Sequence, residues 1–143
     1  MANEARVFAE GVEQVIVRQF TVADGTAIPK GSLLVASGNR TGLIHTAVDD
    51  HKPLGFTTMS KTASDGITEL GCQRTGVVVA VCDGAMSTGD IALASLTTIN
   101  RLQALALRGG GVFSRYQLLQ AQVGRSLDTA ATATTFRCAL MLG

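Results

Sequence analysis

The chain has 143 residues, close to the size of one domain, and twelve Lys and Arg nearly balance eleven Asp and Glu to leave a formal net charge of +1. This balance excludes a strong general attraction to nucleic acid or to an anionic membrane. The apolar content of 46% excludes a chain that stays disordered through high charge and low hydrophobicity.

The chain begins with residues 1–11, which we interpret as an N-terminal arm ahead of a single β domain of residues 12–143. The arm holds Val7 and Phe8 between charged neighbours and lacks the glycine turns that recur elsewhere. Because it has no apolar stretch of the kind that a secretory signal needs, we expect that it is not an export signal. An extended arm can add a strand to the open sheet edge of a partner, and a frayed terminus is the alternative.

After the arm, short apolar runs rich in β-branched residues alternate with turn residues and predict a mostly-β fold. The longest aliphatic run, Val77 to Cys82, is far too short to span a membrane, and within it Val77 to Val81 predicts a strand covered on both faces. Ser114 to Val123 fits a helix or a strand, and the glycines at 109–111 indicate a flexible connector. The predicted strands are Val12–Val17, Leu33–Ala36, Leu54–Thr58, Val77–Val81, Ile91–Leu96, Ile99–Leu107 and Thr134–Leu142.

An internal repeat organises these strands. Ala27 to Ser37 aligns without a gap on Ala85 to Ser95, with four identical residues and a matching apolar pattern. The segment Leu54-Gly55-Phe56 finds a weaker partner in Val123-Gly124-Arg125, so the spacing grows from 58 to 69 residues. We therefore predict two related halves, about 20–80 and 81–143. Because neither half buries enough surface alone, the halves should share a core in a small β-sandwich or distorted barrel.

One polar cluster invites a metal hypothesis. His45 and His51 bracket Asp49 and Asp50, but the spacing matches no established zinc site and no cysteine lies close by. A solvated hairpin tip is the favoured interpretation, because Asp-Asp followed by His-Lys-Pro is ordinary turn chemistry. Neither histidine is assigned a role, and we predict no metal and no cofactor.

Other catalytic signatures are also missing. There is no Gly-x-Ser-x-Gly turn, and Gly124-Arg125-Ser126 stands without an acidic partner motif, so we predict that the chain is not an enzyme. The three cysteines, an odd number without a Cys-x-x-Cys pair, predict reduced and buried thiols. Dispersed basic residues and the lack of an aromatic platform indicate no nucleic-acid partner.

The pattern of glycine turns and apolar strands resembles the small capsid decoration, or cement, proteins of tailed bacteriophages. That resemblance implies an all-β fold of the β-clip or a related sandwich type, a homotrimer on the capsid exterior, and a virion protein made in the host cytoplasm. It also implies that the major capsid protein is the partner, because such proteins bridge capsid subunits against the pressure of packaged DNA. The resemblance rests on Thr26–Leu34, Lys52–Phe56, Gly76–Val79, Ser87–Ser95 and Val123–Leu127.

We assign the capsid contact to the arm and the start of the first predicted strand, through Arg6, Val7, Phe8 and Val12. Two other functions stay open. The chain could be another virion component, such as a head-fibre or tail structural protein. It could also be a β-clip module that binds a ligand or hydrolyses a nucleotide, although the paired acidic and Tyr-containing motifs of those hydrolases are missing here.

Overall fold

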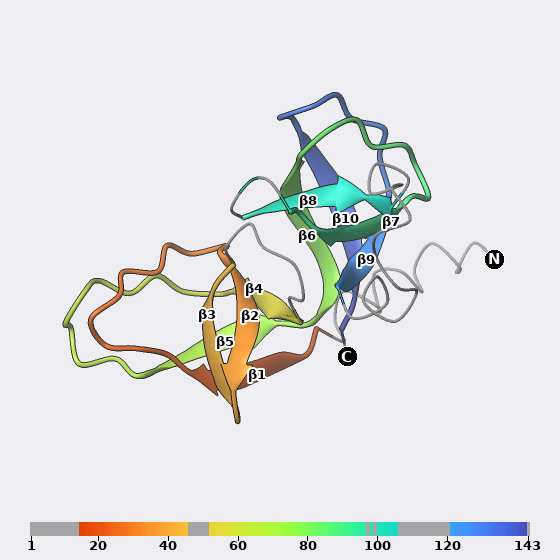
Figure 1. Ribbon diagram of the computed structural model, residues 1–143. Coiled ribbons are helices and arrows are strands. Elements are labelled where there is room, and N and C mark those ends of the chain that lie inside the picture. Colours follow the sequence, from red (N-terminus) through yellow and green to blue (C-terminus); the bar gives the residue numbers. More distant parts are fainter. Residues whose placement is uncertain (1–14, 46–51, 97, 99, 106–120, 143) are drawn as a thin grey trace.

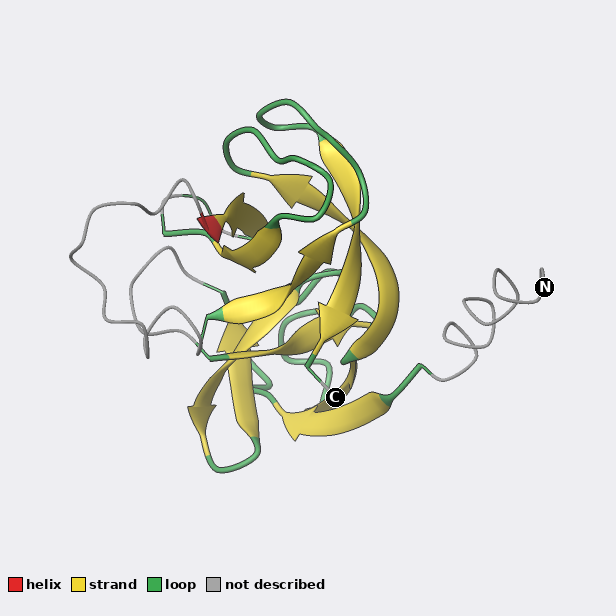
Figure 2. Cartoon of the chain, turned by 90° about the vertical axis from the view of Figure 1, so that its right-hand side faces the viewer, coloured by secondary structure: helices red, strands yellow, loops and turns green. Residues whose placement is uncertain are grey.

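The fold is built from strands and turns (Figures 1 and 2). The computed structural model describes residues 15–45, 52–96, 98, 100–105 and 121–142. Within that part of the chain, no helix is long and apolar enough to cross a membrane. The strands are β1 (Val17–Thr21), β2 (Leu33–Gly38), β3 (Thr41–Ile44), β4 (Pro53–Thr57), β5 (Glu69–Gln73), β6 (Thr75–Cys82), β7 (Ile91–Ala94), β8 (Arg101–Ala104), β9 (Gln122–Ser126) and β10 (Thr135–Met141).

Two closed barrels of five strands follow one another along the chain, and Figure 1 shows them as two lobes. The strand order is β1-β3-β2-β4-β5 in the first barrel and β10-β6-β8-β7-β9 in the second. Each barrel closes with one short parallel contact, β1 on β3 and β6 on β8, and its other pairings are antiparallel. The prediction of an all-β fold built from two related halves is confirmed, and the structure adds that each half closes on itself.

The registers repeat at the spacings that the sequence alignment predicts. An isolated bridge pairs Ile28 with Lys61 in the first half, and its counterpart pairs Met86, 58 residues later, with Ala130, 69 residues later. The register of β2 on β4 shifts between Leu34 and Val35, and that of β7 on β9 shifts at the equivalent residues of the second half. Since even the bulges coincide, the two barrels are structural copies of one unit.

In both copies, a glycine at the same position lets two backbone segments approach each other closely. Gly55 lies at φ 147°, and a Cβ there would come within 2.5 Å of the carbonyl oxygen of Gln73. At the equivalent Gly124 a Cβ would come within 2.0 Å of the carbonyl oxygen of Ala139. Backbone packs directly on backbone at these points, so only glycine fits without displacing a strand.

The strand predictions need several corrections. The first strand of the structure starts at Val17, and the part of the predicted strand before residue 15 lies outside the described residues. Strands β3 and β5 went unpredicted, because short glycine-containing segments carry a weak apolar pattern, whereas β9 forms where Val123-Gly124-Arg125 aligns with the strand at Leu54-Gly55-Phe56. The ambiguous segment that ends at Val123 resolves at its described end, where residues 122 and 123 begin β9.

The prediction that Val77 to Val81 is covered on both faces is wrong. Strand β6 alternates, with Ala80 and Cys82 buried while Val79 is 68% exposed. A barrel wall has only one inner face, so every second residue of β6 points to solvent. The apolar run reflects β-propensity on the outer face as well as core packing on the inner face.

Two apolar clusters form the interior. The smaller one fills the first barrel around Val22, Ile28, Leu34, Leu70 and Cys72. The larger one fills the second barrel and also includes Leu33 and Phe56 from the first half, so among the described residues the predicted shared core is divided into two clusters and is shared only at these two residues. The barrels are therefore joined by packing as well as by the chain that runs from β5 into β6, which Figure 1 shows passing from one lobe to the other.

Candidate interaction surface

The described chain begins at Val15, a few residues after the predicted arm. Val15 lies against Gly76, where a Cβ would come within 2.8 Å of a Val15 methyl carbon. The Ile16 amide donates to the Thr75 hydroxyl, and the Arg74 amide donates to the carbonyl oxygen of Ile16 at 2.8 Å. The chain thus emerges where β5 passes into β6, between the two barrels. The predicted contact residues Arg6, Val7, Phe8 and Val12 themselves lie outside the described residues.

A buried histidine joins the barrels. His45 follows β3 and is completely buried, and the Asn100 amide donates to its Nδ1 at 3.0 Å. Its Nε2 therefore carries the proton and donates to the carbonyl oxygen of Ser95, 2.8 Å away. The Asn100 side chain accepts a hydrogen bond from the amide of Leu33, so the two halves exchange bonds in both directions.

The interpretation of His45 as part of a solvated hairpin tip is therefore wrong. Its imidazole holds the barrel junction, and sequence reasoning missed this because its partners lie 50 and 55 residues away. Asp49, Asp50 and His51, the other members of that predicted cluster, lie beyond the described part of the chain. Among the residues that are described, no group of three or more His, Cys, Asp or Glu side chains is placed to hold a metal.

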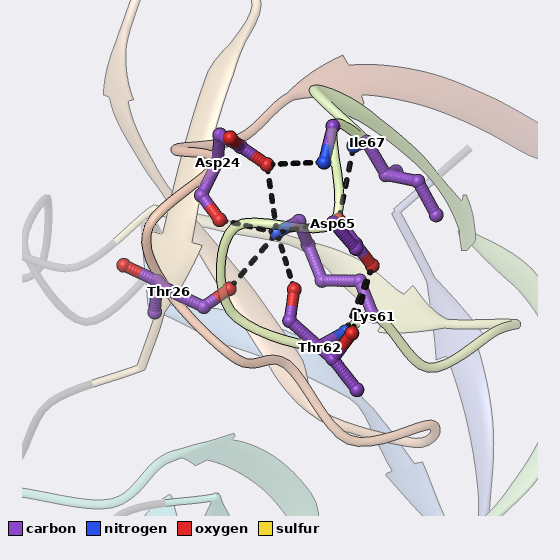
Figure 3. A network of polar contacts seen from close by, with 7 residues as sticks. Asp24, Thr26, Lys61, Thr62, Asp65 and Ile67 are labelled. Atoms are coloured by element: carbon purple, nitrogen blue, oxygen red, sulfur yellow. Dashed lines mark hydrogen bonds and ion pairs between the residues drawn. The ribbon is translucent and has the colours of Figure 1, made fainter.

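A second polar centre locks the loop pair at the far end of the first barrel (Figure 3). The Lys61 side chain has no exposed surface, and its Nζ donates to the carbonyl oxygens of Asp24, Thr26 and Thr62 at 2.7, 3.2 and 3.0 Å. The carboxylates of Asp24 and Asp65 lie 3.8 and 3.3 Å from the same nitrogen. The ammonium thus neutralises two acids and bonds the 24–26 turn to the 61–65 turn.

Hydrogen bonds to the carboxylate of Asp65 hold its pKa below the usual value. The largest cause is the amide of Ile67, and the amide of Thr62 and the ammonium of Lys61 add to it. The second barrel has Ala130 at the position of Lys61. Because the repeat folds without this lysine, the polar lock belongs to the first barrel alone.

The three cysteines are free and buried, as the sequence predicts. Burial raises the pKa of Cys72 to about 11 and that of Cys138 to about 12. The thiolate is the reactive form, so these two thiols are unreactive near neutral pH. They serve as small apolar residues of the two cores.

The outer face of the β6–β10 pair carries several exposed apolar side chains. Val77 and Val79 point outward at 39% and 68% exposure, and Met141, opposite Thr75 on the neighbouring strand, is 56% exposed. Arg137, opposite Val79, lies on the same face and forms an ion pair there with Asp128. Large apolar side chains gathered on one sheet face mark a surface suited to contact with other protein.

Each barrel also leaves one strand edge open. Strand β6 pairs with β8 only at Val81 and Cys82, and a hollow of about 360 Å³ beside its free stretch is lined by residues of both halves, including Phe56 and Val78. Strand β1 pairs with β3 only at Thr21, which leaves Val17 to Phe20 open on that side. Unpaired strand edges carry free main-chain donors and acceptors and accept extended chains.

Comparison with known proteins identifies a fold neighbour. The structure is similar to the head fiber gp8.5 N base of bacteriophage phi29, with a TM-score of 0.54 over 91% of this chain and 97% of that chain. The likeness is one of fold. Sequence identity is 9%, and the sequence matches no protein-family model and no curated protein.

Proposed function

We propose that this chain is a non-catalytic structural protein of a phage virion that binds the outer surface of the capsid. The observation that carries the proposal is the fold likeness to a phage head-fibre base, which spans nearly the whole of both chains. The described polar centres support it, because the side chains of His45 and Lys61 are buried and hold the fold together. On this proposal the protein works through its surfaces.

Within that role, we propose that the chain bridges major capsid subunits and stabilises the shell, with residues 1–11 as the capsid-binding arm. Val15 and Ile16, which follow this arm in the chain, lie where β5 passes into β6, so the outer faces of both lobes are available to neighbouring subunits. The test uses expanded capsids of the phage whose genome carries the chain. The full-length protein should cosediment with capsids and raise their disruption temperature.

The matched variant is a deletion of residues 1–11, which contain Arg6, Val7 and Phe8. It should keep the circular dichroism and thermal unfolding of the full chain and lose capsid binding. Full-length protein that neither cosediments nor changes the disruption temperature would refute the capsid role. A deletion variant that binds normally would refute only the assignment to the arm.

We further propose that copies associate into a homotrimer through the outer face of β6 and β10, because Val77, Val79 and Met141 expose apolar surface there. Val79→Glu should lower the mass measured by light scattering from that of a trimer to that of a monomer. Leu43→Glu changes a residue that is 42% exposed on β3 of the first barrel, a strand that pairs with β1 and β2, and it should leave the mass unchanged. A monomeric full-length protein would contradict the trimer.

A head-fibre base is the second candidate, and the name of the structural neighbour favours it. A cryo-electron microscopy reconstruction of labelled particles separates the two roles. Density that lies flat between capsid subunits supports a decoration protein, whereas density that continues outward into a fibre supports a base. Turnover of nucleoside triphosphates by the purified protein would overturn both and favour the hydrolase alternative.

A further inference from the structure

The open edge of β1 borders a strongly basic hollow. It has a volume of about 670 Å³ and is lined by Val17, Arg18, Gln19, Phe20, Arg40 and Arg74. Among the described residues no carboxylate lines it. Three arginines therefore line the hollow, without a carboxylate in the lining, beside a strand that pairs with β5 on one side and is unpaired from Val17 to Phe20 on the side toward β3.

One of the three arginines is held in place. The Arg74 guanidinium donates through Nε and Nη2 to the carbonyl oxygen of Leu142, and its Cζ lies 5.7 Å from the centre of the Phe20 ring. These contacts orient the group and leave further N–H donors for a ligand, since a guanidinium has five. Part of the entropy cost of binding an anion here is thus already met by the fold.

The second barrel is an internal control for what the fold requires. The parallel bridge Thr21–Thr41 corresponds to Val81–Arg101, so Arg18 corresponds to Val78 and Arg40 to Asn100. By the pairing of β6 with β10, Arg74 corresponds to Leu140. The second barrel has an uncharged residue at each of the three equivalent positions, so the barrel architecture does not need the arginines.

Arg40 also occupies a costly backbone position. Its φ is 54°, in the left-handed region, and the equivalent Asn100 has φ 57°. Asparagine tolerates this region better than most residues, and a long side chain there costs about 1 kcal/mol. An arginine at this turn is therefore explained neither by the local backbone nor by the barrel.

Most acidic side chains in the described part of the chain are used elsewhere. Five of the six described acidic side chains bond to other groups of the fold, and Glu69 on β5 is the remaining one. A second copy of the described part therefore offers little free negative charge to this hollow. The five engaged acids are Asp24, Asp65, Asp83, Asp90 and Asp128.

From these observations we infer that the basic hollow and the open edge of β1 together bind an extended acidic segment of a protein partner. The segment adds main-chain hydrogen bonds to the side of Val17–Phe20 that faces away from β5, and it places carboxylates against Arg18, Arg40 and Arg74. A strand edge beside the charge favours a peptide over a free phosphate or a nucleic acid, because those ligands make no use of main-chain pairing. The inference rests on the proposed function in one respect: the partner on the virion would be a capsid subunit.

The test measures binding of a fluorescent eight-residue peptide of alternating Glu and Val by anisotropy, at 50 and 200 mM salt. A peptide with Gln in place of Glu is the matched ligand control. The acidic peptide should bind, salt should weaken it, and the Gln peptide should bind at least tenfold more weakly. Amide chemical shifts of Val17 to Phe20 should change on binding, which a purely electrostatic contact would not require.

Two variants locate the site. Arg18→Gln combined with Arg40→Asn should weaken peptide binding by about a hundredfold, from about tenfold for each lost charge-assisted contact. Arg125→Gln removes an exposed arginine of the second barrel and should leave the affinity unchanged. Equal binding by all three proteins would overturn the inference, as would tighter binding of polyphosphate or single-stranded DNA than of the peptide.

The same variants separate this inference from the proposed function. Peptide binding without capsid cosedimentation would refute the capsid role and keep the acidic-segment site. Capsid binding that the double variant leaves intact, together with no peptide binding, would refute the site and keep the capsid role. Loss of both activities in the double variant, with unchanged thermal unfolding, is the result that we expect.

Discussion

Replacing the buried lysine of the first barrel gives a sharp test of how that barrel is held together. Lys61→Met keeps the apolar stem and removes the ammonium. Three carbonyl oxygens at 2.7–3.2 Å and two carboxylates then lose their shared donor. Each hydrogen bond to a charged group contributes about 1.5–3 kcal/mol. The three bonds to carbonyl oxygens together would therefore contribute at most about 5–9 kcal/mol to the free energy of unfolding.

The expected loss is smaller, because water can reach the acids once the ammonium is gone. The Asp24 and Asp65 side chains are 43% and 20% exposed, so rehydration recovers part of the energy. We expect the free energy of unfolding to fall by about 2–4 kcal/mol, which corresponds to a decrease in Tm of about 6–14 °C for a chain of this size. The pKa of Asp65 should also rise toward its usual value.

Urea unfolding followed by circular dichroism measures the change, and hydrogen exchange at the Ile28 and Lys61 amides, which form the bridge of the loop pair, reports where it occurs. Lys30→Met in the same loop pair removes an exposed charge and should change stability by less than about 0.5 kcal/mol. If both variants unfold at the wild-type urea midpoint with wild-type exchange, the buried ammonium does not stabilise the loop pair and the reasoning fails.

Three further predictions test other parts of the fold. Gly124→Ala should lower the free energy of unfolding by more than about 3 kcal/mol or prevent folding, because its Cβ would lie 2.0 Å from a backbone oxygen. Gly25→Ala places its Cβ in open space and should leave stability nearly unchanged, and equal urea midpoints for the two variants would contradict this prediction. Hydrogen bonds from the side chain and the amide of Arg137 lower the pKa of Asp128 from 3.8 to about 2, so the stability they add is present above about pH 4 and is lost as the pH falls toward 2. The stability difference between wild type and Asp128→Asn should shrink over that window, and a difference independent of pH would argue against the pair. Cys72 and Cys138 should resist iodoacetamide at pH 8 in the folded protein and react in urea, because burial raises both pKa values well above 8. Peptide mass spectrometry measures the labelling, and rapid labelling of either cysteine in the folded protein would contradict its burial.

Much of the architecture could be predicted from the local pattern of residues. Ala27 to Ser37 and its copy at Ala85 to Ser95 place a glycine turn before a buried strand, and both copies form that arrangement, with φ of 82° at Gly31 and 89° at Gly89. Repetition of a local pattern is a property of the sequence, so alignment finds it and reads the spacing of the halves correctly. The buried thiols follow from the same kind of local reasoning.

The functional features of the surface required the tertiary structure. Arg18, Arg40 and Arg74 are spread over 57 positions and become one basic hollow only when β1, the β2–β3 turn and the end of β5 meet. His45 looks like a turn residue until the second barrel supplies Ser95 and Asn100 as its partners. The sequence pattern indicates which face of a strand is apolar. It does not indicate which distant polar groups become neighbours, because contacts across a sheet or a junction have no fixed spacing along the chain. Those contacts form only when the two barrels close and pack against each other.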